Sequence, residues 1–317
     1  MRNLEVRLMR VPVTAGEFAV EPGEVPRLTN GGILCRARWL SAGPVRAGFP
    51  ASTAMRPGDV VPALAVCEVL ESRHDVFGVG QSVVLHCGMR EMCASDGRDA
   101  VALHPGQSPA STALGLLGPP GKTAYFALTD LAAVGPGETV LVPSASSVTG
   151  AMAGQVAVLK GARAIGIDDS PDRCAWAVRH ARFAACINPR AEDLSQRLWQ
   201  LAPRGCDIVF DPAEALLENL LAGQHLAPGG RVVRLAAGAH TASPSGSTPG
   251  QGKVRILHFS PGAYEQRRSE FLRDAIAWYG AGRLVCREDI AEGIENAPAQ
   301  LARALRGECF GNPLVKL

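Results

Sequence analysis

The alternation of strand and helix signals after about residue 111 constrains the fold of this chain more than any other feature. Residues 139–142 predict a strand, residues 151–160 a helix, and residues 162–167 a second strand. A strand, a crossover helix and a second strand form the βαβ unit from which parallel sheets are built. Its right-handed crossover brings the start of the helix to the carboxyl edge of the strands, so we expect a ligand to bind at that edge.

The same alternation continues to about residue 236. Residues 193–201 and 213–225 predict helices, and residues 207–210 and 231–235 predict strands. The segment 238–252 is rich in Gly, Ser, Thr, Ala and Pro, so we expect an exposed loop there.

The first 110 residues or so follow a different pattern. Short strands are predicted at residues 31–39, 62–70 and 80–85, where apolar and polar positions alternate between glycine and proline turns. The chain therefore combines a mostly β unit with a parallel α/β unit. Its 317 residues are enough for two domains that each bury a core.

The charge distribution narrows the range of partners. Net charge is only +2, from 32 basic and 30 acidic residues, and the basic residues are scattered, which disfavours nucleic acid and anionic membranes. The first residues carry charge where a signal peptide would be apolar, and the sequence has no run of about 18 apolar residues. We therefore expect a cytoplasmic protein with a small-molecule partner.

The nine cysteines include no C-x-x-C pair, although such pairs are the usual signature of a structural zinc site. Cys35, Cys87 and Cys93 with His86 form an imaginable ligand set. A small apolar residue that fills core volume is the more economical interpretation of each cysteine. We therefore expect reduced, buried thiols and no zinc.

Several segments, spread in order along nearly the whole chain, are similar to those of one known family. They are residues 40–44 (LSAGP), 80–84 (GQSVV), 114–125 (LGLLGPPGKTAY), 134–142 (VGPGETVLV), 154–161 (GQVAVLKG), 288–298 (EDIAEGIENAP) and 310–316 (FGNPLVK). In these segments the chain resembles the medium-chain dehydrogenase/reductase superfamily, in its zinc-independent prostaglandin and alkenal double-bond reductase branch.

The resemblance implies a fold and an activity. The implied fold is a GroES-like β domain, residues 1–112 completed by 285–317, with a Rossmann domain of doubly wound parallel sheet at 113–284. The implied activity is hydride transfer from NADPH to the β-carbon of an α,β-unsaturated ketone or aldehyde, followed by protonation of the α-carbon. Relatives often dimerise through edge strands, and residues 254–259 are the candidate edge strand for a homodimer.

The turn after the first strand of the α/β unit departs from the family pattern A-A-x-G-x-x-G. Residues 144–150 read SASSVTG, so the first motif glycine is replaced by Ser147 while Gly150 is retained. Because glycine permits a tight turn and close approach of the pyrophosphate, we expect the Cβ of Ser147 to crowd the ligand or shift the turn. The hydroxyls of Ser146, Ser147 and Thr149 near a helix N-terminus nevertheless favour an anion, and we assign these residues with Gly150 to cofactor binding.

Asp168 and Arg173 point to different cofactors. Asp168 ends the second strand, where a carboxylate would bind the adenosine ribose of NAD(H) and repel the 2′-phosphate of NADP(H). Arg173 falls on the family's phosphate-binding lysine and favours NADP(H), whereas the assisting tyrosine is replaced by Pro189. An alternative is that Asp168 and the following Asp169 only cap the next helix, which Pro171 would begin.

Three polar residues are candidates for the chemistry itself. Tyr125 lies in the shared segment at residues 121–125. Glu214 is a newcomer in the loop that reads N-V-G-G in the family and PAEA here, and a buried carboxylate with a raised pKa could act as a general acid or base. Thr241 stands near the position of the family's loop tyrosine. An ordinary packing role is the alternative for each.

Three functions remain open at this stage. The first is an NAD(P)H-dependent reductase of a conjugated enone or a related secondary metabolite. The second is a cofactor-independent, redox-neutral enzyme on the same scaffold, such as a cyclase, an isomerase or a catalyst of Michael-type addition. The third is a non-catalytic binding or structural protein. Binding of NADH or NADPH distinguishes the first from the other two.

Overall fold

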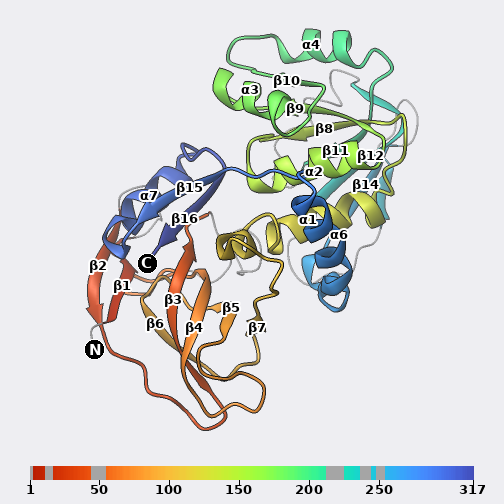
Figure 1. Ribbon diagram of the computed structural model, residues 1–317. Coiled ribbons are helices and arrows are strands. Elements are labelled where there is room, and N and C mark those ends of the chain that lie inside the picture. The colour runs from red at the N-terminus through yellow and green to blue at the C-terminus, as the bar shows by residue number, and fades with distance from the viewer. Residues whose placement is uncertain (1–2, 11–16, 44–54, 212–224, 236–243, 248–253) are drawn as a thin grey trace. The chain divides into compact units, whose positions relative to one another are not determined.

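The computed structural model describes residues 3–10, 17–43, 55–211, 225–235, 244–247 and 254–317. The chain forms two compact units, which are coloured along the sequence in Figure 1. The first unit joins the two ends of the chain, Met1–Gly118 and Glu288–Leu317, and the second is the continuous segment Pro119–Arg287.

The first unit is built mainly of antiparallel strands. Its large sheet has the order β15-β16-β3-β4-β5-β7, with β6 also paired to β3. The bounds are β3 Ile33–Ser41, β4 Leu64–Ser72, β5 Ser82–His86, β6 Met92–Ser95, β7 Val101–Ala102, β15 Glu288–Glu292 and β16 Asn312–Lys316. A separate antiparallel pair consists of β1 Asn3–Leu8 and β2 Phe18–Gly23, and the helix α7 spans Ala297–Leu305. Because β16 pairs with β3, the end of the chain completes the N-terminal sheet.

The core of this unit follows from the alternation seen in the sequence. Side chains at every second position of β3, β4 and β5 face inward, and among them are Val69, Val83 and Leu85. The predicted strands at 31–39, 62–70 and 80–85 are confirmed, although each begins slightly later than expected. Gly31 lies instead in a turn with a φ of 72°, a conformation that glycine adopts without strain.

The second unit contains a seven-stranded sheet in the order β10-β9-β8-β11-β12-β14-β13, parallel except for β13. The bounds are β8 Thr139–Pro143, β9 Arg163–Ile167, β10 Ala185–Ile187, β11 Cys206–Phe210, β12 Leu226–Leu235, β13 Pro244–Ser247 and β14 Arg255–Phe259. The first strand, β8, has the next two on one side and the later ones on the other, which is the doubly wound order. The predicted pairing of a GroES-like domain with a Rossmann domain is therefore confirmed.

One prediction about this sheet is wrong. Residues 254–259 were expected to form an exposed edge, but β14 lies between β12 and β13. The covering strand β13 comes from the segment 238–252, which was predicted to be a loop. Antiparallel pairing with β13 satisfies the backbone groups that an edge would expose, so this edge no longer argues for a dimer. The predicted helix at 213–225 falls almost entirely outside the described residues.

Three of the described helices in the second unit begin directly after a residue whose side chain caps them. The bounds of this unit's helices are α1 Pro119–Phe126, α2 Val148–Leu159, α3 Pro171–Arg179, α4 Leu194–Leu201 and α6 Arg268–Gly280, with a π-helical turn, Ala127–Leu131, after α1. The hydroxyls of Ser147 and Ser170 cap α2 and α3, and the carboxylate of Asp193 caps α4. The helix predicted at 151–160 therefore starts three residues earlier, directly after its cap.

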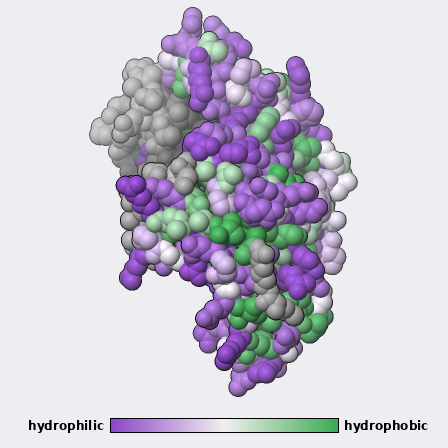
Figure 2. Space-filling model, turned by 90° about the vertical axis from the view of Figure 1, so that its left-hand side faces the viewer, coloured by the Kyte–Doolittle hydropathy of each residue, from purple (hydrophilic) through white to green (hydrophobic). Residues whose placement is uncertain are grey.

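The described surface carries a mixture of side chains. Hydrophilic residues cover most of the face shown in Figure 2, and smaller hydrophobic areas lie between them. Among the described helices, none has the length and apolar character needed to cross a membrane.

Candidate functional site

The candidate site is the turn that leads from β8 into α2, at the carboxyl edge of the parallel sheet. The strained residue in this turn is Ser144, whose φ of 49° is unusual for a residue with a Cβ. Ser147 has an ordinary extended conformation, with a φ of −67°, so its backbone does not require glycine. Its hydroxyl accepts a hydrogen bond of 3.1 Å from the N–H of Gly150. The serine in place of the first motif glycine therefore acts as the N-cap of α2.

Two glycines in α2, Gly150 and Gly154, are each required for a different steric reason. A Cβ at Gly150 would lie 2.3 Å from the carbonyl oxygen of Ser144, so only glycine lets the helix approach the turn this closely. A Cβ at Gly154 would lie 2.0 Å from the ring of Phe183. Both distances are far below van der Waals contact, and the first turns of α2 are therefore packed tightly against the turn and the next β-α segment.

Asp168 holds the turn from the end of the neighbouring strand, β9. One of its carboxylate oxygens accepts a hydrogen bond of 2.8 Å from the N–H of Ser146, and the other accepts one of 3.0 Å from the N–H of Asp169. The residue is only 6% exposed. The cap of α3 is Ser170, and Pro171 is its first helical residue. Asp168 therefore does not cap α3, and its contacts connect two adjacent β-α turns. Its contact with a cofactor ribose stays a prediction.

The exposed carboxylate beside it, Asp169, is shared by two arginines. Arg173 Nη1 lies 2.9 Å from one oxygen of Asp169, and Arg190 Nη2 lies 3.0 Å from the other. Arg173 is also 3.8 Å from the Asp168 carboxylate, and its side chain is only 15% exposed. Arg190 follows β10 and is 74% exposed. Two guanidinium groups thus gather beside the end of β9.

This arrangement has the electrostatic character of an anion site. The first N–H groups of a helix have no carbonyl partners within it, and the helix dipole places partial positive charge there. Since the cap uses the N–H of Gly150, a bound phosphate would meet the N–H groups of Val148 and Thr149. Ser146 is nearly buried and Thr149 is half-buried, so of these two hydroxyls Thr149 has the greater exposure.

Tyr125 lies in the last turn of α1, and its hydrogen bond and ring contacts are with residues outside the β8–α2 turn. Its hydroxyl donates a hydrogen bond of 2.6 Å to Asp274, and its ring packs against Phe126, Phe271 and Trp278. Burial, and then the bond to the Asp274 carboxylate, raise the pKa of Tyr125 well above its usual value. These contacts are those of a packing residue that connects α1 to α6.

The other candidates divide into those the structure describes and those it does not. Ser146, Ser147, Thr149, Gly150, Asp168 and Arg173 gather at the ends of β8 and β9. Glu214 and Thr241 lie outside the described residues and stay predictions. Sequence reasoning did not single out Arg190, although it directly follows Pro189, which replaces the family's phosphate-assisting tyrosine.

Comparisons with known proteins agree with this geometry. Residues 5–103 match the family model described as the N-terminal domain of oxidoreductase, and residues 148–277 match the one described as zinc-binding dehydrogenase. Prostaglandin reductase 1 of Bos taurus is 32% identical over 96% of this chain and 94% of its own length. The NADPH-dependent curcumin reductase of Escherichia coli K12 is 30% identical over 95% of this chain and 92% of its own.

A solved structure is similar to this chain over nearly its whole length. The crystal structure of CurA from Vibrio vulnificus in complex with NADPH has a TM-score of 0.85, with 28% identity over 99% of this chain and 98% of that one. The β unit and the doubly wound unit define a two-domain oxidoreductase. The chain belongs to the medium-chain dehydrogenase/reductase superfamily, in its zinc-independent prostaglandin and alkenal reductase branch.

Proposed function

We propose that this protein is an NADPH-dependent reductase of a carbon–carbon double bond conjugated to a carbonyl group in a small molecule. The observation that carries the proposal is the turn between β8 and α2, which has the features of a phosphate site even though its first motif glycine is Ser147. Relatives that cover nearly the whole chain are named as reductases of prostaglandin and curcumin, the latter NADPH-dependent. A neighbouring structure with NADPH adds support.

The residues of the turn fit the pyrophosphate of such a cofactor. The Ser147 hydroxyl is directed to its own helix, where it accepts from Gly150. Gly150 leaves the helix N-terminus close to the turn, since a Cβ there would collide with the Ser144 carbonyl. Asp168 holds Ser146 in place through its backbone N–H. The chain thus binds the phosphates with backbone groups that are fixed before the ligand arrives.

Arg173 and Arg190 favour NADPH over NADH. Asp168 accepts hydrogen bonds from two backbone N–H groups, so we assign its carboxylate to holding the turn and not to distinguishing between the two cofactors. The exposed carboxylate, Asp169, keeps both guanidinium groups together. A 2′-phosphate would replace Asp169 as their partner, because guanidinium groups bind phosphate by paired, charge-assisted hydrogen bonds.

When bound, NADPH supplies the hydride that adds to the β-carbon of the substrate. The protein contributes position and electrostatics: the α2 N-terminus and the arginines fix the phosphate end, so that the reactive end is held in one orientation. The Tyr125 hydroxyl donates its proton in the hydrogen bond to Asp274, so we assign it no step of the reaction. Glu214 and Thr241 are proposed to contact the substrate carbonyl, and an unchanged turnover of Glu214→Gln would remove Glu214 from this role.

The test is a titration of the purified protein with NADPH and NADH, followed by turnover of curcumin and pulegone with the preferred cofactor. We expect tighter binding of NADPH. Arg190→Ala removes a charge-assisted bond worth about 1.5–3 kcal/mol, so NADPH should bind about 10- to 150-fold more weakly while NADH is unaffected. Arg204→Ala, an exposed arginine after α4, is the matched control and should change neither affinity.

Two outcomes would contradict the proposal. Binding of neither nucleotide at millimolar concentration would exclude a reductase. An equal loss of NADPH and NADH affinity in Arg190→Ala would remove the arginine pair from cofactor discrimination. The comparisons give no support to the redox-neutral alternative, which would become the leading one only if substrate were converted with no nucleotide present.

A further inference from the structure

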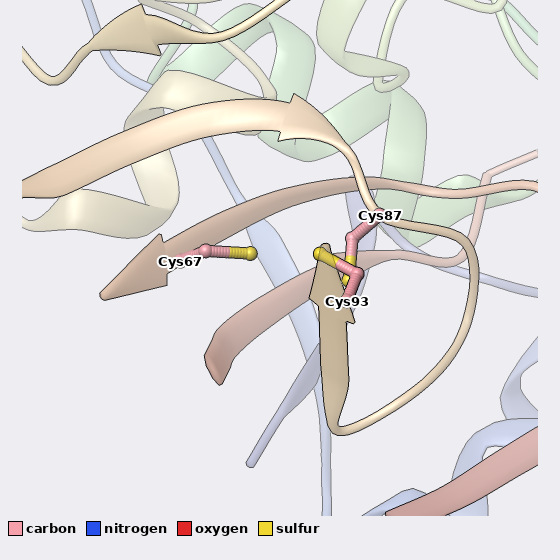
Figure 3. A group of neighbouring side chains, drawn as sticks. All are labelled: Cys67, Cys87 and Cys93. Atoms are coloured by element: carbon pink, nitrogen blue, oxygen red, sulfur yellow. The ribbon is translucent and has the colours of Figure 1, made fainter. Parts of the chain in front are cut away.

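Three cysteines from three separate segments of the first unit meet in its core. Cys67 lies on β4, Cys87 directly follows β5, and Cys93 lies on β6. Their sulfur atoms are all within 4.8 Å of one another, and Figure 3 shows the side chains pointing toward a common centre. The residues are 0%, 4% and 4% exposed. Strand pairing thus positions Cys67 and Cys93, and Cys87 is held directly after the end of β5.

The register of the sheet produces this convergence. Cys67 pairs with Val83 across β4 and β5, and Cys93 pairs with Cys35 across β3 and β6. Because alternate residues of a strand share one face, these pairings direct the cysteines into the same core. Cys35 is buried in that core too, but it is not part of the group in which all sulfur atoms lie mutually close.

A cation with a free donor accompanies the thiols. Arg90 lies between Cys87 and Cys93 in sequence, and its Nε is buried with no hydrogen-bond partner among the described residues. A Cβ at Gly88 would lie 3.2 Å from that Nε, so the guanidinium group passes over the backbone next to Cys87. Glu5 pairs with Arg90 at 3.3 Å but is shared with Arg7 at 2.5 Å. A partly buried guanidinium group with a buried, unused Nε donor suits a site that becomes negatively charged when the thiols ionise.

We propose that Cys67, Cys87 and Cys93 form a three-thiolate binding site for a soft monovalent d¹⁰ cation, with Cu(I) as the fitting ion. Soft thiolate ligands select such ions, whereas structural zinc sites use four ligands in a tetrahedron. The closely spaced group supplies three sulfur atoms, which suits trigonal coordination. On binding, each ligating thiol releases its proton to solvent, the ion remains Cu(I), and no electron is exchanged.

This site is independent of the proposed cofactor site. Its three ligands and Arg90 all belong to the segment Met1–Gly118, whereas the β8–α2 turn and its arginines belong to Pro119–Arg287. It also lies outside residues 148–277, which match the zinc-binding dehydrogenase family model. If the protein did not bind NADPH, the thiolate proposal would therefore still stand. If it did not bind Cu(I), the cofactor proposal would still stand.

The experiment is an anaerobic titration of the reduced full-length protein with Cu(I) in competition with bicinchoninate. We expect about one Cu(I) per chain held by the trio, and X-ray absorption of the loaded wild-type protein should show three sulfur neighbours. Cys67→Ala, Cys87→Ala and Cys93→Ala should each abolish this binding. The control is Cys186→Ala, which disrupts a close thiol pair in the second unit, Cys174 and Cys186 at 3.0 Å, and should leave the binding intact.

Any of four results would overturn the assignment. The first is that the wild-type protein binds no Cu(I), and the second is that X-ray absorption shows two sulfur neighbours in place of three. The third is that Cys186→Ala loses binding while the variants of Cys67, Cys87 and Cys93 retain it. The fourth is tight binding of Zn(II) without Cu(I), which would contradict the trigonal assignment. The coordination number is measured on wild-type protein, so the proposal stays testable even if a core substitution prevents folding.

Discussion

Removal of the Asp168 carboxylate should loosen the cofactor turn itself. In Asp168→Ala the N–H of Ser146, which is nearly buried, loses an acceptor at 2.8 Å, and the half-buried N–H of Asp169 loses one at 3.0 Å. A hydrogen bond to a charged group contributes about 1.5–3 kcal/mol, and the Asp169 N–H can turn to solvent instead. We therefore expect the free energy of unfolding to fall by about 2–3 kcal/mol, which lowers the Tm by roughly 5–10 °C.

The assay is urea unfolding followed by circular dichroism, together with titrations of NADPH and NADH. Both nucleotides should bind more weakly by a similar factor, because the turn serves the phosphates that they share. Asp168→Asn keeps one oxygen acceptor and should lose about half as much stability. The control is Asp172→Ala, an exposed carboxylate in the first turn of α3, whose loss should matter by less than about 1 kcal/mol.

One pattern of results would refute this reasoning. If Asp168→Ala kept its stability while its preference shifted from NADH toward NADPH, the carboxylate would be a ribose ligand. The connection between the two turns would then be incidental.

Three further changes probe packing and ion pairing in the second unit. Gly154→Ala should lower the free energy of unfolding by about 1–3 kcal/mol, because its Cβ would lie 2.0 Å from the Phe183 ring. The double variant Gly154→Ala with Phe183→Leu should regain part of this loss. Urea unfolding of the single and the double variant checks both expectations. Tyr125→Phe should leave kcat unchanged and reduce stability by about 1 kcal/mol, and a large fall in kcat would restore a chemical role to this residue. The hydrogen bond from Arg267 lowers the pKa of Asp130 below its usual 3.8. The stability lost in Asp130→Asn should therefore be constant above about pH 5, begin to shrink as the pH falls through about 4, and vanish only below the lowered pKa of Asp130 in the folded protein. Urea unfolding across this pH range checks the prediction, and a pH-independent difference would contradict the ion pair.

Much of the fold is readable from sequence because it depends on local periodicity. Alternating segments before residue 110 and strand–helix alternation after it follow from which faces must be buried, and both units are observed. Boundaries were missed where a cap set them, as at Ser147, although a serine before a helical pattern is a readable signal. Strand β13 was missed because its pairing with β14 is tertiary and its Gly- and Ser-rich sequence has weak strand propensity.

The sequence predicted where the candidate site lies on the sheet, but not which hydrogen bonds its residues form. The position of Gly150 and Asp168 after successive strands placed both residues at one sheet edge. That Asp168 would bind the Ser146 N–H, 22 positions away, depends on the relative height of two turns, which no local pattern encodes. The meeting of Cys67, Cys87 and Cys93 likewise requires the pairing register of β3, β4, β5 and β6, so spacing along the sequence could not reveal it.

The most direct test of the proposed function is transfer of a labelled hydride. Purified protein is incubated with a conjugated enone and NADPH deuterated at the transferable C4 position, and the product is analysed by NMR. We predict a saturated ketone with one deuterium on the former β-carbon. An unlabelled product, or conversion that proceeds equally without the nucleotide, would contradict the account.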